Sequence, residues 1–419
     1  MIRTQAPAYT QSKTINLVFP KIIEVENGGK IYLQDAVQDE SVKIDFEWSA
    51  GSKFQSKRLV ASFTNRMLLA GTTSKNARQI AEEIDFYGGY TQLECDKDHA
   101  GFTIYGLSDQ MLNIIPLVQE AVSAAQFPDE QLKKEVEIGK SKFKIEVEKV
   151  KVLARRKFNQ MVFGENKPYS QVAQLSDFDS LKKEDLQSFF AEYYQGIPEI
   201  FVTGNVSQDV IDLLKTWLGN YQAKEQRLDK AEDYSSVSGE FHVKKEGAIQ
   251  TSIRVGRTLF SKTHPDYFNF QLLNTVLGGY FGSRLMTNIR EDKGYTYGIG
   301  SGLAVLQDGA YFFTATEVAS DVAENTLNEI KFELERLQNE LIDEAELNKV
   351  KNYMLGEFLR QADGPIAQME MFKNIYFNKL DKTYYHDFIQ AIHSANADEL
   401  RDVAQRYLNW EDMLIVTAG

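Results

Sequence analysis

The sequence is poor in the residues that usually hold transition metals. It contains a single cysteine, Cys95, so an intrachain disulfide and a centre built from several cysteines are both excluded. Its few histidines are scattered along the chain: His99, His242, His264, His386 and His393. No two of them have the spacing of ligands on one helical face. The sequence therefore offers few imidazole and thiolate ligands for a metal site.

Long apolar runs and an excess of positive charge are also missing. No run approaches the roughly 18–20 apolar residues that cross a bilayer, so we expect no membrane span. With 60 acidic and 47 basic residues the net charge is −13, which argues against a nucleic-acid binder. The first residues, MIRTQAPAYTQSKTINLVFP, lack the pattern of a signal peptide. We expect a cytoplasmic protein, or a periplasmic one if a leader has been removed.

What the chain does have is enough apolar material for several cores. Hydrophobic residues make up 43% of its 419 residues, a length that predicts two or more domains. Residues 183–206 and 397–419 share one layout, an amphipathic helix followed by a turn and a β-rich strand. At a constant separation of 214 residues, four pairs are identical: Leu186 and Leu400, Tyr193 and Tyr407, Val202 and Val416, Thr203 and Thr417. The helix starts PDEQLKK (128–134) and IDEAELNK (342–349) share this separation, which indicates an internal duplication.

The domain organisation follows from this duplication. A polar, charged stretch at 221–241 is typical of an exposed linker, so we predict domains at 1–220 and 242–419. Strand patterns at 41–50, 100–108 and 309–318 are mixed with helical patterns such as 323–342, without strict alternation. This favours an α+β fold of two homologous domains, each an antiparallel-rich mixed sheet packed with helices.

One short stretch, ASFTNRMLLAGT (61–72), has the layout of a helix that carries a site. Helical spacing places Ser62, Asn65 and Arg66 on one side of a turn. The opposite, apolar stripe consists of Leu59, Val60, Phe63, Met67 and Ala70. Yet Ser62, Asn65 and Arg66 are not ordinary metal ligands or proton shuttles.

The second half contains LGGYFGSRLMTNIREDKGYTYGIGSG (277–302), which matches no phosphate-binding loop. It closely resembles the C-terminal signature of the insulinase/pitrilysin family, whose smaller members include the mitochondrial processing peptidases. The two-half organisation agrees, so the resemblance covers almost the whole chain. It implies the fold of a zinc metalloendopeptidase.

Active members of that family carry an inverted zinc motif, H-x-x-E-H, on a helix of the first half. In ASFTNRMLLAGT, Ser62 and Arg66 stand where the two histidines would be, and Asn65 where the glutamate would be. The window that would hold the third ligand, IGKSKFK (138–144), contains three lysines and no carboxylate, while Glu137 lies just outside it. Positive side chains at these positions oppose cation binding. The resemblance thus implies a degenerate motif and no metal or other cofactor in this chain.

In the family, an arginine and a tyrosine of the second half hold the substrate backbone and stabilise the tetrahedral intermediate. Arg290 and Tyr297 match these positions, and their donors suit an oxyanion. A peptide substrate adds a strand to the edge of the first sheet in such enzymes. The matching segment, GGYTQLECDKDHAGF (88–102), makes Gln92, Leu93 and Glu94 the candidate peptide-binding residues.

Together these features predict a non-catalytic subunit of a heteromeric insulinase-family peptidase. It would form a heterodimer with a zinc-bearing homologue, close the chamber and lend Arg290 and Tyr297 to the partner's site for endoproteolysis of peptides or unfolded segments. Alone, it would be inactive. Two alternatives remain open: a structural or assembly subunit, and a free-standing homodimer that captures peptides without cutting them.

Overall fold

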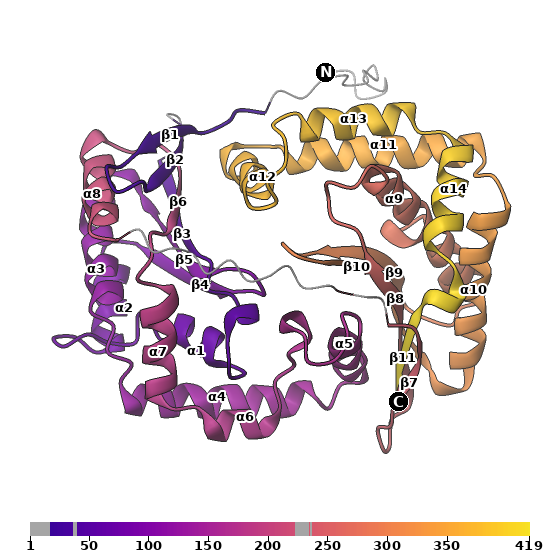
Figure 1. Cartoon of the computed structure of the whole chain (residues 1–419), viewed down its shortest axis with the longest axis horizontal. Helices are drawn as coiled ribbons and strands as arrows, with labels where there is room; N and C mark the ends of the chain where they lie inside the picture. The colour runs from indigo at the N-terminus through magenta and orange to yellow at the C-terminus, as the bar shows by residue number, and fades with distance from the viewer. Residues whose placement is uncertain (1–16, 37–39, 223–233, 235–236) are drawn as a thin grey trace, which may run out of the picture.

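The computed structural model describes residues 17–36, 40–222, 234 and 237–419. Two sheets, each covered by helices, face one another across the molecule (Figure 1). The first sheet has the order β1-β2-β6-β3-β5-β4. Its strands are β1 (Lys21–Glu24), β2 (Lys30–Gln34), β3 (Ser41–Trp48), β4 (Tyr90–Cys95), β5 (Ala100–Leu107) and β6 (Glu199–Thr203).

The second sheet repeats this topology in the order β7-β11-β8-β10-β9. Its strands are β7 (Gly239–Val243), β8 (Gln250–Leu259), β9 (Ile299–Val305), β10 (Ala310–Ala319) and β11 (Leu414–Ala418). In each sheet one pair is parallel, β2 with β6 and β7 with β11, and the other pairs are antiparallel. Without β1, the two strand orders superimpose one for one. The predicted α+β fold of two homologous halves is thus confirmed.

Helices surround both sheets. Those of the first half are α1 (Val60–Arg66), α2 (Ala77–Phe86), α3 (Met111–Ser123), α4 (Asp129–Glu146), α5 (Val150–Met161), α6 (Leu175–Ser180), α7 (Lys183–Tyr193) and α8 (Gln208–Gly219). Those of the second are α9 (Tyr267–Asn274), α10 (Ala323–Asn339), α11 (Glu344–Gln361), α12 (Pro365–Phe377), α13 (Tyr384–Ser394) and α14 (Ala397–Tyr407). The repeated helix–strand segments are α7–β6 and α14–β11, and the repeated helix starts open α4 and α11.

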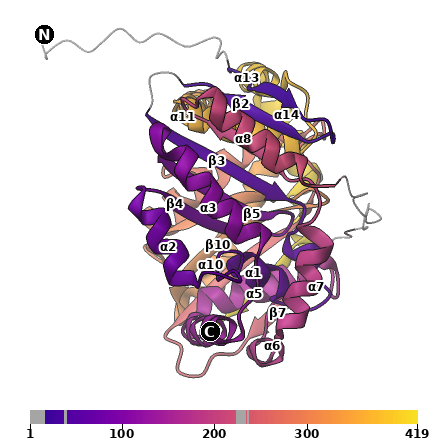
Figure 2. The ribbon, with the colours of Figure 1, turned by 90° about the vertical axis from the view of Figure 1, so that its left-hand side faces the viewer.

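Each sheet has one core on its outer face. On β3, alternate side chains such as Val42, Ile44 and Phe46 enter a core shared with α3 and α8, as the period of a strand requires. Figure 2 shows these two helices lying over the strands. The equivalent core of the second half lies between its sheet and helices that include α9, α10 and α14. These outer cores follow directly from the apolar patterning of the sequence.

The inner faces of the sheets are covered by helices exchanged between the halves. Helix α5 of the first half packs on β8 and β11, where Phe158 meets Leu414 and Val416 (Figure 1). Helix α12 of the second half packs on the first sheet, where Met369 meets Tyr32 and Phe201. Each half therefore covers apolar surface on the sheet of the other half.

A charged network fastens α12 to the first sheet. The ammonium of Lys43 lies 2.9 Å from a carboxylate oxygen of Asp45 and 2.6 Å from one of Glu370. Lys373 of α12 lies 3.5 Å from Asp45 as well. Because Lys43 and Asp45 are buried, their charges must be matched across the contact.

A second network joins the strand turns of the two halves. Lys53 lies 3.0 Å from the carboxylate of Asp98 and 2.8 Å from that of Asp308 in the turn between β9 and β10. The hydroxyl of Tyr169 donates to Asp98, and the backbone N–H of Gln307 donates to the same carboxylate at 3.1 Å. These contacts fix one sheet relative to the other.

The predicted domain boundaries meet this structure only in part. The linker at 221–241 falls largely on residues 223–233 and 235–236, which lie outside the described residues. Its end needs a correction, since Gly239, Glu240 and Phe241 already pair with β11 as part of β7. The polar composition of this stretch gives no sign of a strand, so the pairing with β11 is what shows where β7 begins.

Candidate functional site

Helix α1 is short and enters the first half at an unusual turn. Its N-cap residue, Leu59, has a φ of 71°, a left-handed conformation that is costly for a branched side chain. Val60, Ala61 and Phe63 are buried, which anchors the helix by its apolar stripe. The polar residues that follow are therefore held in fixed positions.

Asn65 stands at the glutamate position of the zinc motif, and its amide is tied into the protein. Its side chain is 2% exposed; Nδ2 donates to the carbonyl oxygen of Glu94 at 2.7 Å, and Oδ1 accepts from the hydroxyl of Tyr194 at 2.9 Å. Burial raises the pKa of Tyr194 well above its usual value, so the hydroxyl remains a donor. Asn65 thus links α1 to β4 and to the end of α7. It offers no proton acceptor for catalysis.

Ser62 and Arg66 stand at the histidine positions. The hydroxyl of Ser62 donates to the carbonyl oxygen of Leu59 at 3.0 Å, a bond within its own turn. The guanidinium of Arg66 lies over the ring of Phe63 at 4.9 Å and 3.9 Å from a carboxylate oxygen of Glu135 on α4. A cation therefore occupies the space between α1 and α4.

The residues at these positions do not fit zinc. Lys140, in the window expected for the third ligand, pairs with Asp179, and Cys95 has its thiol pKa raised by burial to about 12. Over the residues that the structure describes, no three His, Cys, Asp or Glu side chains gather as a metal site would require. An amide, a hydroxyl and a guanidinium lack the imidazole and carboxylate donors that zinc prefers. These positions therefore do not supply the ligands of a zinc site.

Strand β4 forms the free edge of the first sheet, where the candidate peptide-binding residues lie. The N–H of Asp96 donates to the carbonyl of His99, so Glu94 and Gln92 also face β5 in the alternating ladder. The backbone of Leu93 therefore points to the open edge, and its side chain packs against the outer core. The bulk of Leu93 is thus absorbed by the core, on the face opposite Gln92 and Glu94.

Arg290 and Tyr297 lie on and just after η5 (Met286–Asp292), a widened helical turn of the π type. Such turns are frequent at functional sites. The Arg290 guanidinium stacks on the ring of Phe281 at 4.6 Å, and within the described residues it forms no ion pair, even with neighbouring Glu291 or Asp292. Tyr297 is 97% exposed. Arg290 is half-buried, so of the two donors the Tyr297 hydroxyl is the more exposed.

Three residues of this region escaped sequence reasoning. Tyr194 and Glu135, the partners of Asn65 and Arg66, carry no local signal, because they come from distant helices. Phe281, the ring under Arg290, lies inside the Gly-rich signature and could have been noted as its exposed aromatic residue.

Fold and site together define a class: a duplicated α+β protein of peptidase type, with an altered metal-binding helix in the first half and an Arg–Tyr pair in the second. Residues 30–167 match the family model described as insulinase (peptidase family M16), and residues 180–354 match the model described as the peptidase M16 inactive domain. The chain belongs to the insulinase family of peptidases.

Relatives and solved structures agree with this placement. An uncharacterized zinc protease of Bacillus subtilis is 24% identical over 82% of this chain and 85% of its own length. A probable mitochondrial-processing peptidase subunit beta of Arabidopsis thaliana is 18% identical over 95% of this chain and 78% of its own. The crystal structure of a peptidase M16 inactive domain from Pseudomonas fluorescens has a TM-score of 0.86 at 23% identity, covering 96% of this chain and 98% of that one. A Helicobacter pylori protease has a TM-score of 0.84 at 18% identity over 96% and 100% of the chains. These structures establish the shared fold.

Among the helices that the structure describes, none combines the length and the apolar character needed to cross a bilayer.

Proposed function

We propose that this chain is the non-catalytic subunit of a heteromeric insulinase-family peptidase. It pairs with a homologue that carries an intact H-x-x-E-H motif and closes a chamber around peptides or unfolded segments. Hydrolysis takes place at the partner's metal site. This chain contributes Arg290 and Tyr297, whose donors bind the substrate carbonyl and stabilise its developing negative charge.

One contrast carries the proposal. In the first half, Asn65 is buried and bonded on both sides, so the glutamate position serves structure alone. In the second half, Tyr297 is exposed, and Arg290 is half-buried against the ring of Phe281 with no ion pair in the described residues. A chain that only supported an assembly would have no need to present a guanidinium and a phenol in this way.

The test is reconstitution with a family member that has the intact motif. We expect the isolated chain to leave unstructured peptides uncut and to contain no stoichiometric zinc by elemental analysis, while the complex cleaves them. Arg290→Gln and Tyr297→Phe should each lower kcat of the complex by about 100-fold, the usual loss for one oxyanion donor. Lys293→Gln is the matched control, because this exposed lysine pairs with Glu329 and should leave kcat unchanged.

Two outcomes would overturn the proposal. Zinc-dependent cleavage by the isolated chain would give it a metal site of its own. Unchanged kcat in both the Arg290→Gln and Tyr297→Phe complexes would leave a structural subunit as the better description.

A second candidate, capture of peptides by a homodimer, is favoured by the open edge of β4. Light scattering combined with a peptide titration of the purified chain separates it from the first. Saturable binding by a dimer, with no gain in activity on adding the homologue, would support capture.

A further inference from the structure

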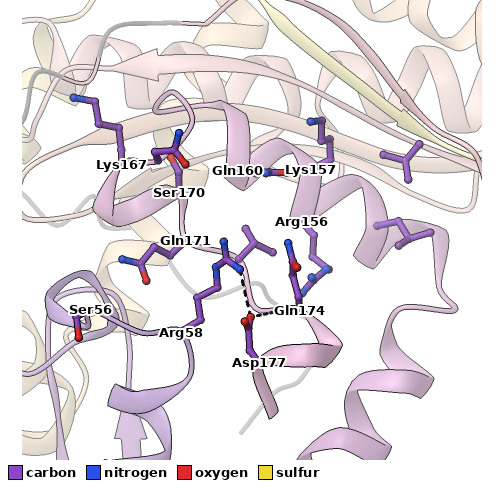
Figure 3. A pocket seen from close by; sticks show the side chains of 14 residues that line it. Ser56, Arg58, Arg156, Lys157, Gln160, Lys167, Ser170, Gln171, Gln174 and Asp177 are labelled. Carbon is purple, nitrogen blue, oxygen red and sulfur yellow. Dashed lines mark hydrogen bonds and ion pairs between the residues drawn. The ribbon is translucent and has the colours of Figure 1, made fainter. Parts of the chain in front are cut away.

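A pocket of about 590 Å³ lies between α5, η3 (Pro168–Ser170) and the segment after it, α6 and the residues that precede α1 (Figure 3). Val243 of β7 adds a wall from the second half. Pockets of this size hold small organic ligands. None of the residues that line this pocket has a role in the proposed function.

The charge of this pocket is opposite to that of the chain. Four cationic side chains line it, and one carboxylate, Asp177, accompanies them. The cationic residues are Arg58, Arg156, Lys157 and Lys167. In a protein of net charge −13, this concentration of positive charge marks a site that attracts anions.

The single carboxylate is already engaged and does not neutralise the pocket. Asp177 accepts a hydrogen bond from the backbone N–H of Gln174 at 2.6 Å, which caps the start of α6. It also lies 3.6 Å from Arg58, as the dashed lines of Figure 3 show. Asp177 also acts on Arg156, whereas Lys157 forms no ion pair within the described residues.

Arg156 and Lys157 are held in place by neutral groups. Arg156 donates to the carbonyl of Ala173 and stacks on the ring of Phe143 at 4.7 Å. Burial, with a contribution from Arg155, lowers the pKa of Arg156 against the opposing effect of Asp177. The ammonium of Lys157 lies 5.2 Å above the ring of Phe241, with no carboxylate partner among the described residues. Both side chains are thus oriented without being neutralised, as pre-organised anion ligands are.

Ser170 supplies a further donor. This pocket-lining residue is 4% exposed, and in the described part of the chain its hydroxyl has no hydrogen-bond partner. A buried hydroxyl without a partner is costly, so a native site commonly satisfies it with a ligand or solvent. A guanidinium, an ammonium and a hydroxyl together form the donor set that binds a phosphate group.

From this geometry we propose that the pocket binds a small molecule carrying a phosphate or pyrophosphate group. Arg58, Arg156 and Lys157 bind its oxygens, and the hydroxyl of Ser170 donates to it. The amide side chains of Gln160 and Gln174, which also line the pocket, suit hydroxyl groups on the rest of the ligand.

The experiment is isothermal titration of the full chain at low ionic strength with pyrophosphate, inorganic phosphate and citrate. We expect saturable one-to-one binding of pyrophosphate, weaker binding of phosphate, and loss of affinity as salt is added. Citrate has comparable charge and tests whether carboxylates serve equally well. A rise in thermal stability with pyrophosphate concentration provides a second readout.

The matched variants are Lys157→Gln and Lys151→Gln, two lysines of α5 of which only the first lines the pocket. Lys157→Gln should weaken pyrophosphate binding by about tenfold, as removal of one charge-assisted hydrogen bond does. Lys151→Gln should leave it unchanged; Lys151 lies outside the pocket, near Glu317. Absence of saturable binding, equal loss in both variants, or tighter binding of citrate than of pyrophosphate would each overturn the proposal. None of these results bears on the peptidase activity of the complex, so the two proposals can fail separately.

Discussion

At the residue scale, Asn65 shows what an amide does at the position that the family motif gives to a glutamate. A glutamate there would bring a buried negative charge against the carbonyl of Glu94, which accepts rather than donates. The amide resolves this conflict, because it donates to the carbonyl and accepts from Tyr194 at once. The Asn65 side chain thereby couples α1 to β4 and to the end of α7.

This coupling predicts the effect of truncation. Asn65→Ala leaves the buried hydroxyl of Tyr194 without its partner, so the free energy of unfolding should fall by about 1–3 kcal/mol. Ser62→Ala, the control on the same helix, removes only a bond within one turn and should change it by less than about 0.5 kcal/mol. Urea unfolding of both variants measures the difference. Equal effects would mean that the Asn65 amide has no special structural role.

At the element scale, two glycines in equivalent helices differ in what surrounds them. A Cβ on Gly139 of α4 would lie 3.0 Å from the ring of Phe178 and 3.2 Å from that of Phe63, whereas one on Gly356 of α11 meets nothing within 4 Å. Gly139 is therefore what lets α4 approach α1 and α6.

Valine at each position tests this directly. Gly139→Val should lower the free energy of unfolding by about 1–3 kcal/mol through overpacking. Gly356→Val should stay within about 0.5 kcal/mol of the parent, since valine is no worse than glycine in a helix. Thermal denaturation compares the two. A tolerated Gly139→Val would show that α4 can shift away from α1.

The sequence predicts elements well where a pattern is local or repeated. The duplicated helix–strand segments gave α7–β6 and α14–β11, and the altered motif led to Ser62, Asn65 and Arg66. The exchange of α5 and α12 could not be predicted, because an amphipathic pattern reveals an apolar face but not which sheet it meets. The same applies to Tyr194, whose contact with Asn65 spans 129 positions of the chain.

At the scale of the whole molecule, His99 lies where the two halves meet. Its Nε2 is 2.9 Å from the amide nitrogen of Gln307, and its ring lies 4.2 Å from that of Phe377 on α12. Protonation of a histidine at such a junction can make the free energy of unfolding of the chain depend on pH.

Burial lowers the pKa of His99 below its ordinary value of 6.5, and the nearby ammonium groups of Lys53 and Lys373 act in the same direction. The carboxylates of Asp96 and Asp98 oppose the shift. Below about pH 6.5 the unfolded chain therefore takes up a proton that the folded chain resists. The contribution of neutral His99 to the free energy of unfolding should therefore be complete above pH 6.5 and be lost as the pH falls.

The measurement is the free energy of unfolding between pH 7.5 and 5 for three proteins. His99→Gln should make its decline with acid shallower than in the parent. His386→Gln, which removes an exposed histidine of α13, should leave the slope unchanged. A parent-like slope in the His99→Gln protein would assign the acid sensitivity to other groups.

The helix exchange described above also constrains how the two repeats can evolve. Since α5 lies on one sheet and α12 on the other, neither repeat can be deleted, traded with a relative or produced singly without uncovering an apolar surface. Each repeat therefore supplies a cover that a solitary copy of the other would lack.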